Sequence, residues 1–108
     1  MARIPSATRN ALPWAPDYVD VRSLAVSTAK SWTVPAGIVS VTIWYTAGVL
    51  WMKKGGTAVV PIGDVSDGSA SKVIGQGESF QVSAGDVLSF INATACFVVI
   101  GGDRVNSQ

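Results

Sequence analysis

Turn-forming residues recur at short and nearly even intervals from Pro35 to the C-terminus. The signals fall roughly every 8 to 11 residues, the spacing typical of short antiparallel strands in a sandwich or barrel. The runs between them are rich in valine, isoleucine, threonine and aromatic residues, and no window keeps a helical apolar period for three turns. We therefore expect an all-β fold: an antiparallel β-sandwich, jelly-roll-like, with about eight strands. The turn signals are Pro35-Ala36-Gly37, Ala47-Gly48, Gly55-Gly56, Gly63 to Ser69, Gly75-Gln76-Gly77, Ala84-Gly85-Asp86, Asn92-Ala93-Thr94 and Gly101-Gly102.

The clearest predicted strand covers Ile38 to Thr46, where apolar and polar residues alternate. A two-residue loop at Ala47-Gly48 predicts a hairpin that returns as Val49 to Lys54. In that register Trp44 lies directly opposite Trp51 on the outer face. The predicted core face of the first strand consists of Val39, Val41, Ile43 and Tyr45.

The other predicted strands follow the same two patterns of alternating or continuous apolar residues. Phe80 and Val82 alternate with polar neighbours, and Ala95 to Ile100 is a nearly continuous apolar run suited to a central strand. The remaining predicted strands are Tyr18 to Ser27, Ser31 to Val34, Thr57 to Ile62 and Val87 to Ile91.

The first 17 residues differ in character from the rest of the chain. Met1 to Asp17 contains three prolines, two arginines and no usable apolar period. Such a segment cannot bury enough apolar surface to offset the entropy of ordering it, so we expect a partner to hold it. We divide the chain into an extended N-terminal docking arm, residues 1–17, and a β-sandwich domain, residues 18–108. The residues expected to make the arm's contacts are Arg3, Ile4, Arg9, Leu12 and Trp14, whose arginines suit bidentate pairing with carboxylates.

Residue types that carry catalysis or bind metals are scarce. The chain has no histidine and a single cysteine, Cys96, so a nucleophile lacks its usual base and zinc lacks its usual ligands. We interpret Glu78 as a solvated strand start and Asp86 as a residue that makes a local turn bond. The stretch Asp64 to Gly68 is interpreted as a polar turn, because its glycine is misplaced for a calcium loop. We expect a non-enzymatic protein with no catalytic residue, metal site or cofactor.

Charge is also sparse. Only 14% of residues are charged while 48% are hydrophobic, and the net charge is +1. A protein with so few charges has apolar surface that usually ends in an interface. A nearly neutral chain is a poor electrostatic partner for nucleic acid. No segment approaches the length needed to span a bilayer, and no stretch resembles the core of a signal peptide. We expect neither a nucleic-acid nor a membrane partner, and synthesis in a cytoplasm.

Tryptophan is frequent, with four residues in the chain. The predicted pair Trp44 and Trp51 has three interpretations: an anchor at a protein interface, a stacking platform for sugar rings, or a second core layer covered by Trp14 or a loop. Trp14 favours the interface, because Leu12-Pro13-Trp14 is apolar in a segment without a core of its own.

Two stretches resemble small tailed-phage virion proteins. Trp32 to Ile43 is similar to the x-V-P-A-G-V-x-x-V-x-V strand pair of head-decoration and tail-fibre domains. Glu78 to Phe90 is similar to the G-E-x-F-x-V-x-A-G-D-x-L-x-F hairpin of the same proteins. Together they cover about 25 residues, under a quarter of the chain. The resemblance implies a jelly-roll-like, usually trimeric, structural protein that clamps a capsid or joins a tail.

These observations together lead to one functional expectation. We expect a decoration or cement protein of the virion, assembled in the host cytoplasm, that binds the major capsid protein lattice as a homotrimer. Trp44 and Trp51 are the residues expected at the interface with another subunit or partner. Two alternatives stay open: a tail, baseplate or fibre component, and a carbohydrate-binding β-sandwich module.

Overall fold

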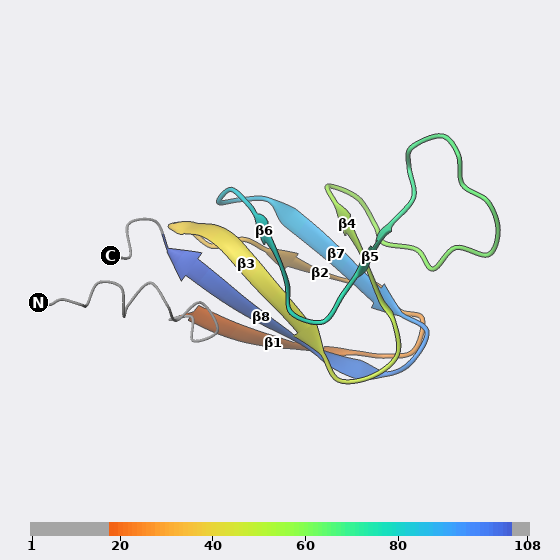
Figure 1. Cartoon of the computed structure of the whole chain (residues 1–108), viewed down its shortest axis with the longest axis horizontal. Helices are drawn as coiled ribbons and strands as arrows, with labels where there is room; N and C mark the ends of the chain where they lie inside the picture. Colours follow the sequence, from red (N-terminus) through yellow and green to blue (C-terminus); the bar gives the residue numbers. More distant parts are fainter. Residues whose placement is uncertain (1–17, 105–108) are drawn as a thin grey trace, which may run out of the picture.

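A computed structural model describes residues 18–104. Within this range, eight strands form two four-stranded antiparallel sheets and no helix occurs (Figure 1). Sheet A has the order β1-β8-β3-β6 and sheet B the order β2-β7-β4-β5. The predicted all-β antiparallel sandwich of about eight strands is confirmed. The strands are β1 (Tyr18–Leu24), β2 (Lys30–Thr33), β3 (Ile38–Tyr45), β4 (Leu50–Lys54), β5 (Lys72–Ile74), β6 (Glu78–Gln81), β7 (Val87–Asn92) and β8 (Cys96–Arg104).

The strand order is that of a jelly roll. β1 pairs with β8, β2 with β7, β3 with β6 and β4 with β5, so the chain is one long hairpin wound into a sandwich. Two further pairs, β3 with β8 and β4 with β7, join the windings into the two sheets. The loop of residues 55–71 forms the tip of this hairpin and extends away from the sheets in Figure 1. Such a fold leaves each sheet with one inner and one outer face.

The core fills the space between the two inner faces. Phe90 on β7 and Trp32 on β2 are its largest fully buried side chains. β8 lies between β1 and β3 in sheet A, which confirms that Ala95 to Ile100 contributes a central strand. The buried cluster comprises Leu24, Trp32, Val34, Ile38, Val41, Ile43, Leu50, Met52, Ile74, Leu88, Phe90, Cys96, Val98 and Ile100.

The predicted hairpin between Ile38–Thr46 and Val49–Lys54 is wrong. β3 lies in sheet A and β4 in sheet B, so residues 46–49 carry the chain from one sheet to the other. The buried Asn92 side chain holds this crossover, because its Nδ2 donates to the Ala47 carbonyl oxygen at 2.8 Å. Alternation shows which face of a strand is buried but not which strand lies beside it, and both sheets offer an apolar inner face. Trp44 and Trp51 are therefore not cross-strand neighbours.

The predicted core face of β3 also needs one correction. Val41 and Ile43 are buried as expected, but Val39 is exposed and Ile38 is buried in its place. The register shifts between Ile38 and Ser40, where β3 pairs with β8. An irregularity of this kind inserts a residue into the ladder and moves the alternation to the other face.

The predicted strand at Thr57 to Ile62 is wrong as well. These residues belong to the loop 55–71. The strand that follows β4 is instead the short β5, Lys72–Ile74. Pro61 has no backbone N–H to give to a ladder, which disfavours strand pairing in this stretch. The number of strands agrees with the prediction although this assignment does not.

Candidate functional site

The acidic residues interpreted as parts of turns and strand ends make local structural contacts. Asp86 accepts a hydrogen bond from the backbone N–H of Ser83 at 2.9 Å and lies 3.4 Å from the Lys54 ammonium. These two contacts hold the pKa of Asp86 below its ordinary value. Asp86 therefore makes the local turn bond predicted for it, and Glu78 begins β6 as predicted.

The carboxylates of Glu78 and Asp67 also accept hydrogen bonds from nearby groups. Glu78 accepts from Lys72 Nζ at 2.7 Å and from the backbone N–H of Gly75 at 2.9 Å, which lowers its pKa. Asp67 accepts from the hydroxyl and backbone N–H of Ser69, which lowers its pKa and confirms a polar turn. Across the described part of the chain, no three histidine, cysteine, aspartate or glutamate residues gather to hold a metal ion.

The thiol of Cys96 lies in the core. Burial raises its pKa, although a contact from Asn92 Nδ2 at 3.4 Å opposes the rise. A buried thiol with a raised pKa is a poor nucleophile. The predicted burial of Cys96 is confirmed.

The three tryptophans of the described range have different environments. Trp32 is buried, and its Nε1–H donates to Asp20 Oδ2 at 2.7 Å. Trp44 is half-buried on the outer face of sheet A, where its indole packs near the backbone of Gly77. Trp51 is half-buried on the outer face of sheet B, between Val73 and Ile91. Trp44 and Trp51 thus lie on opposite outer faces of the sandwich.

The outer face of sheet A carries a contiguous apolar patch. Val21 on β1 pairs with Val99 on β8, and Val99 also pairs with Trp44 on β3, so the three form a row across the sheet. Val19 and Phe97 flank this row. Val19, Val21 and Phe97 are 55%, 52% and 53% exposed. We call these five residues the sheet A patch.

The edge strand β1 shows why this patch is unusual. Asp20 and Arg22 share the inward face: Asp20 accepts hydrogen bonds from Trp32 Nε1 and from the Tyr18 hydroxyl, and lies 3.6 Å from Arg22. The two valines of β1 consequently face outward. A half-buried strand normally places its apolar residues toward the core and its polar residues toward solvent. The reversed orientation leaves large apolar side chains exposed on the outer face of sheet A.

Part of the outer face of sheet B, by contrast, is covered by the loop 55–71. Ala58, in the loop 55–71, is buried, and its backbone N–H donates to Ser89 Oγ at 2.9 Å. Ser89 and Ile91 of β7 are buried although they are not part of the core cluster between the sheets. Lys53 Nζ donates to the Ser69 carbonyl oxygen at 2.6 Å and ties a later part of the loop to β4. The loop therefore covers part of the outer face of sheet B, while Val73 of β5 stays 44% exposed there.

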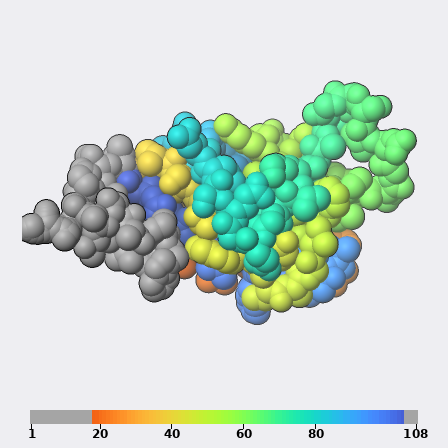
Figure 2. Space-filling model, viewed as in Figure 1, coloured from red at the N-terminus to blue at the C-terminus, as the bar shows by residue number. Residues whose placement is uncertain are grey.

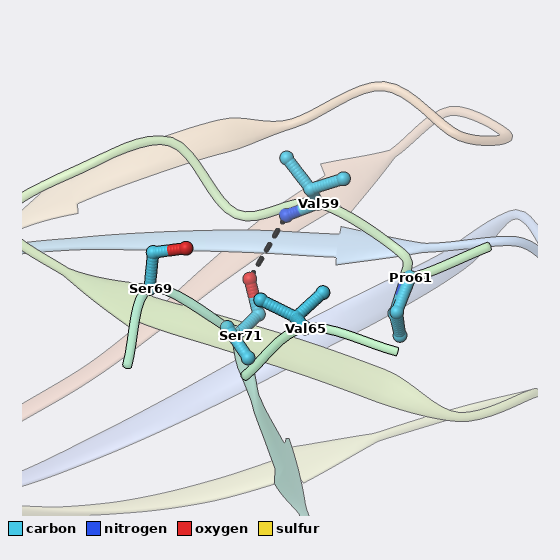
Figure 3. A pocket seen from close by; sticks show the side chains of 6 residues that line it. Val59, Pro61, Val65, Ser69 and Ser71 are labelled. Atoms are coloured by element: carbon cyan, nitrogen blue, oxygen red, sulfur yellow. Dashed lines mark hydrogen bonds between the residues drawn. The ribbon is translucent and has the colours of Figure 1, made fainter. Parts of the chain in front are cut away.

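The rest of the loop 55–71 projects outward (Figure 2). Val59, Ile62 and Val65 are exposed there, with Ile62 fully so. A hollow of about 200 Å³ lies between the two arms of the loop, and the Val59 backbone N–H donates to Ser71 Oγ across it at 2.9 Å (Figure 3). None of the side chains that line it is titratable: Val59, Pro61, Val65, Ser69, Ala70 and Ser71. The hollow offers no acid or base for chemistry, whereas the exposed tip offers apolar contact area.

The residues expected to act in docking are only partly placed by the structure. Arg3, Ile4, Arg9, Leu12 and Trp14 lie outside the described residues. Of the predicted interface pair, Trp44 belongs to the sheet A patch and Trp51 does not. Sequence reasoning missed Val19, Val21, Phe97 and Val99. One signal was present in the sequence, because the run from Phe97 to Ile100 is apolar on both faces of its strand.

Comparisons with known proteins give no relative: no protein-family model, curated protein or solved structure matches the chain. Residues 18–104 also contain no helix with the length and apolar character needed to cross a membrane.

Proposed function

We propose that the chain is a non-enzymatic structural protein of a phage virion, which binds the assembled capsid lattice as a decoration or cement protein. The observation that best supports this function is a jelly roll whose large apolar side chains stay exposed on two separate elements. These are the sheet A patch and the tip of the loop 55–71. Exposed apolar surface on a chain with so few charges is typical of a protein that works in an assembly.

The physical mechanism is mass action. A subunit that binds the assembled lattice but not the free capsid protein stabilises the lattice. At a free concentration 100 times the dissociation constant, this stabilisation is about 2.7 kcal/mol for each site. No reacting group is required, which agrees with the structural use of Glu78, Asp86 and Asp67 described above.

The two alternatives are affected differently by the structure. A stacking platform for sugars required Trp44 and Trp51 side by side, and they lie on opposite faces of the sandwich. That removes the argument for a carbohydrate-binding module. A tail, baseplate or fibre component would use the same surfaces at another place in the virion. Electron microscopy of particles that carry the labelled chain separates head from tail.

The proposed docking arm is tested by deleting residues 1–17 and measuring binding to undecorated heads. We expect at least a roughly tenfold loss of affinity, which corresponds to about 1.4 kcal/mol. The core of the sandwich is formed entirely by residues 24–100, so the truncated chain is expected to fold. A thermal unfolding curve of the truncated chain provides the control. Undiminished occupancy of the heads by a folded, truncated chain would remove the arm from the mechanism.

A further inference from the structure

We propose that residues 12–14 pair with the free edge of β1 in the same chain and add a short antiparallel strand to sheet A. In this register Trp14 lies opposite Val19. Leu12, two residues earlier in the chain, lies opposite Val21. The proposal does not depend on the proposed function. The other residues expected in the contacts of the docking arm stay available to the lattice: Arg3, Ile4 and Arg9.

The strand β1 forms one edge of sheet A and is the longest edge strand among residues 18–104 (Figure 1). It has seven residues, whereas the other edge strands, β2, β5 and β6, have three or four. A long edge presents unpaired N–H and C=O groups that favour the addition of a strand, and proteins cover such edges. Within residues 18–104 β1 pairs with β8 alone, so its other side is open to a strand from outside that range.

The backbone groups that β1 offers at this edge belong to Val19 and Val21. On the neighbouring β8, the Phe97 C=O accepts from the Thr46 N–H, and the Phe97 N–H donates to Thr46 Oγ1. Both groups of Phe97 therefore face β3. Ser23 lies opposite Phe97 on β1, so its own backbone groups face the free edge. Alternation along the strand gives Val21 and Val19 the same direction.

A contact from Lys30 supports this direction and limits the pairing. Lys30 Nζ donates to the Ser23 carbonyl oxygen at 3.1 Å, which agrees with an oxygen that points away from β8. Because that carbonyl has a partner already, a strand added to β1 ends before Ser23. The groups left for pairing are those of Val19 and Val21.

The apolar residues that precede β1 in the sequence fit these two positions. Trp14 opposite Val19 is a pair of an aromatic and a β-branched residue, which is favourable across neighbouring strands. Leu12 opposite Val21 is also apolar. Both pairs lie on the outer face of sheet A, where Val19 and Val21 are 55% and 52% exposed. The added strand therefore covers part of two valines that β8 leaves exposed.

The proline between these residues fits the same register. Pro13 comes opposite Asp20, whose backbone groups face β8. The nitrogen of Pro13 then points away from β1, so its missing N–H removes no bond from the ladder. A shift by one residue would turn that nitrogen toward β1 and place the apolar side chains on the other face.

The connection to β1 favours the chain's own residues over a strand from another molecule. The four residues 15–18 link the paired positions, and loops of this length are most often built around a type I turn. Pro16 takes the second position of such a turn, where its fixed φ is favourable. A tether this short gives residues 12–14 an effective concentration at the edge of roughly millimolar. A separate strand would have to compete with that concentration.

Residue-resolved hydrogen exchange tests the pairing through the alternation of β1. We would compare the full-length chain with a chain that lacks residues 1–14. The amides of Asp20 and Arg22 bond to β8, so we expect the deletion to change their exchange by less than about threefold. The amides of Val19 and Val21 are expected to exchange at least about tenfold faster without residues 1–14. Unchanged exchange at these two valines would overturn the inference.

Two proline substitutions in the full-length chain make a matched pair. Leu12→Pro removes an N–H that the ladder uses on Val21, whereas Ala11→Pro removes one that faces away from β1, as in Pro13. We expect Leu12→Pro to speed exchange at Val21 at least about tenfold and Ala11→Pro to change it by less than about threefold. Equal effects of the two substitutions would contradict the proposed register.

The same measurement separates this occupant from others. Protection of Val19 and Val21 that rises with the concentration of the chain would assign the edge to a second copy, and protection that appears only on heads would assign it to the lattice. Either result overturns the inference. Head binding is measured separately: a chain with a protected edge that leaves heads undecorated contradicts the proposed function alone, and a chain that binds heads with an unprotected edge contradicts this inference alone.

Discussion

Replacing Trp32 with alanine is expected to destabilise the sandwich by about 4 kcal/mol, the middle of the range for deleting a buried aromatic side chain. Trp32 is 2% exposed and spans the core from β2 toward β1, where its Nε1–H meets Asp20. The substitution leaves a large cavity and removes the 2.7 Å hydrogen bond from Trp32 Nε1 to the Asp20 carboxylate, whose contacts with Tyr18 and Arg22 remain.

Trp51→Ala is the matched control for this prediction. Trp51 is half-buried on the outer face of sheet B, so its removal is expected to cost about 1 kcal/mol. Urea denaturation of the wild-type chain and both variants gives the free energies of unfolding. Equal losses for Trp32→Ala and Trp51→Ala would show that the core does not lie where the structure places it.

Gly48→Ala is expected to destabilise the fold by about 3 kcal/mol. Gly48 has φ = +69°, a backbone conformation that costs an L-residue roughly 1–2 kcal/mol. An added Cβ would also lie 2.5 Å from Asn92 Oδ1 and 2.8 Å from Thr94 Cβ. Overpacking of this kind adds roughly 1–3 kcal/mol, because Asn92 is fixed by its own bonds to Ala47 and Thr94.

Gly55→Ala separates the two contributions. Gly55 has a similar φ of +77°, but an added Cβ there meets nothing within 4 Å. Only the backbone cost applies, so we expect a loss of about 1 kcal/mol. Thermal unfolding of both variants measures the difference. If Gly48→Ala costs no more than Gly55→Ala, the crossover between the sheets is not held against Asn92.

The sequence predicted those features of the fold that depend on local chemistry. The turn at Ala84-Gly85-Asp86 was predictable because aspartate accepts from a backbone N–H nearby, and the structure contains that bond. The central position of Ala95 to Ile100 was predictable because a continuous apolar run suits a strand with neighbours on both sides. Each of these two features depends on a few residues that are adjacent in the sequence.

The features that were wrong depend on pairing over long distances. β3 and β4 read as a hairpin because they are close in sequence, yet β3 pairs with β6 and β8 and β4 with β5 and β7. Nothing in residues 46–49 alone reveals that Asn92 will hold them as a crossover. Local patterns fix the buried face of a strand, but the winding of a jelly roll decides its neighbours.

The sheet A patch could not be predicted for the same reason, because it also depends on contacts between residues distant in the sequence. In Tyr18–Leu24, alternation would place Val19 and Val21 inward, and the contact between Asp20 and Trp32 places them outward instead. That contact joins residues of different sheets, so the sequence of β1 does not contain it. The apolar character of Phe97 and Val99 was visible, but its meaning required knowing that nothing within residues 18–104 covers that face.

Titration of undecorated heads with the full-length chain tests the central claim most directly. The account predicts saturable binding with a fixed number of copies for each assembled head, and no binding to unassembled capsid protein at the same concentrations. A chain that leaves heads undecorated, or that binds free capsid protein as tightly as the lattice, would contradict it.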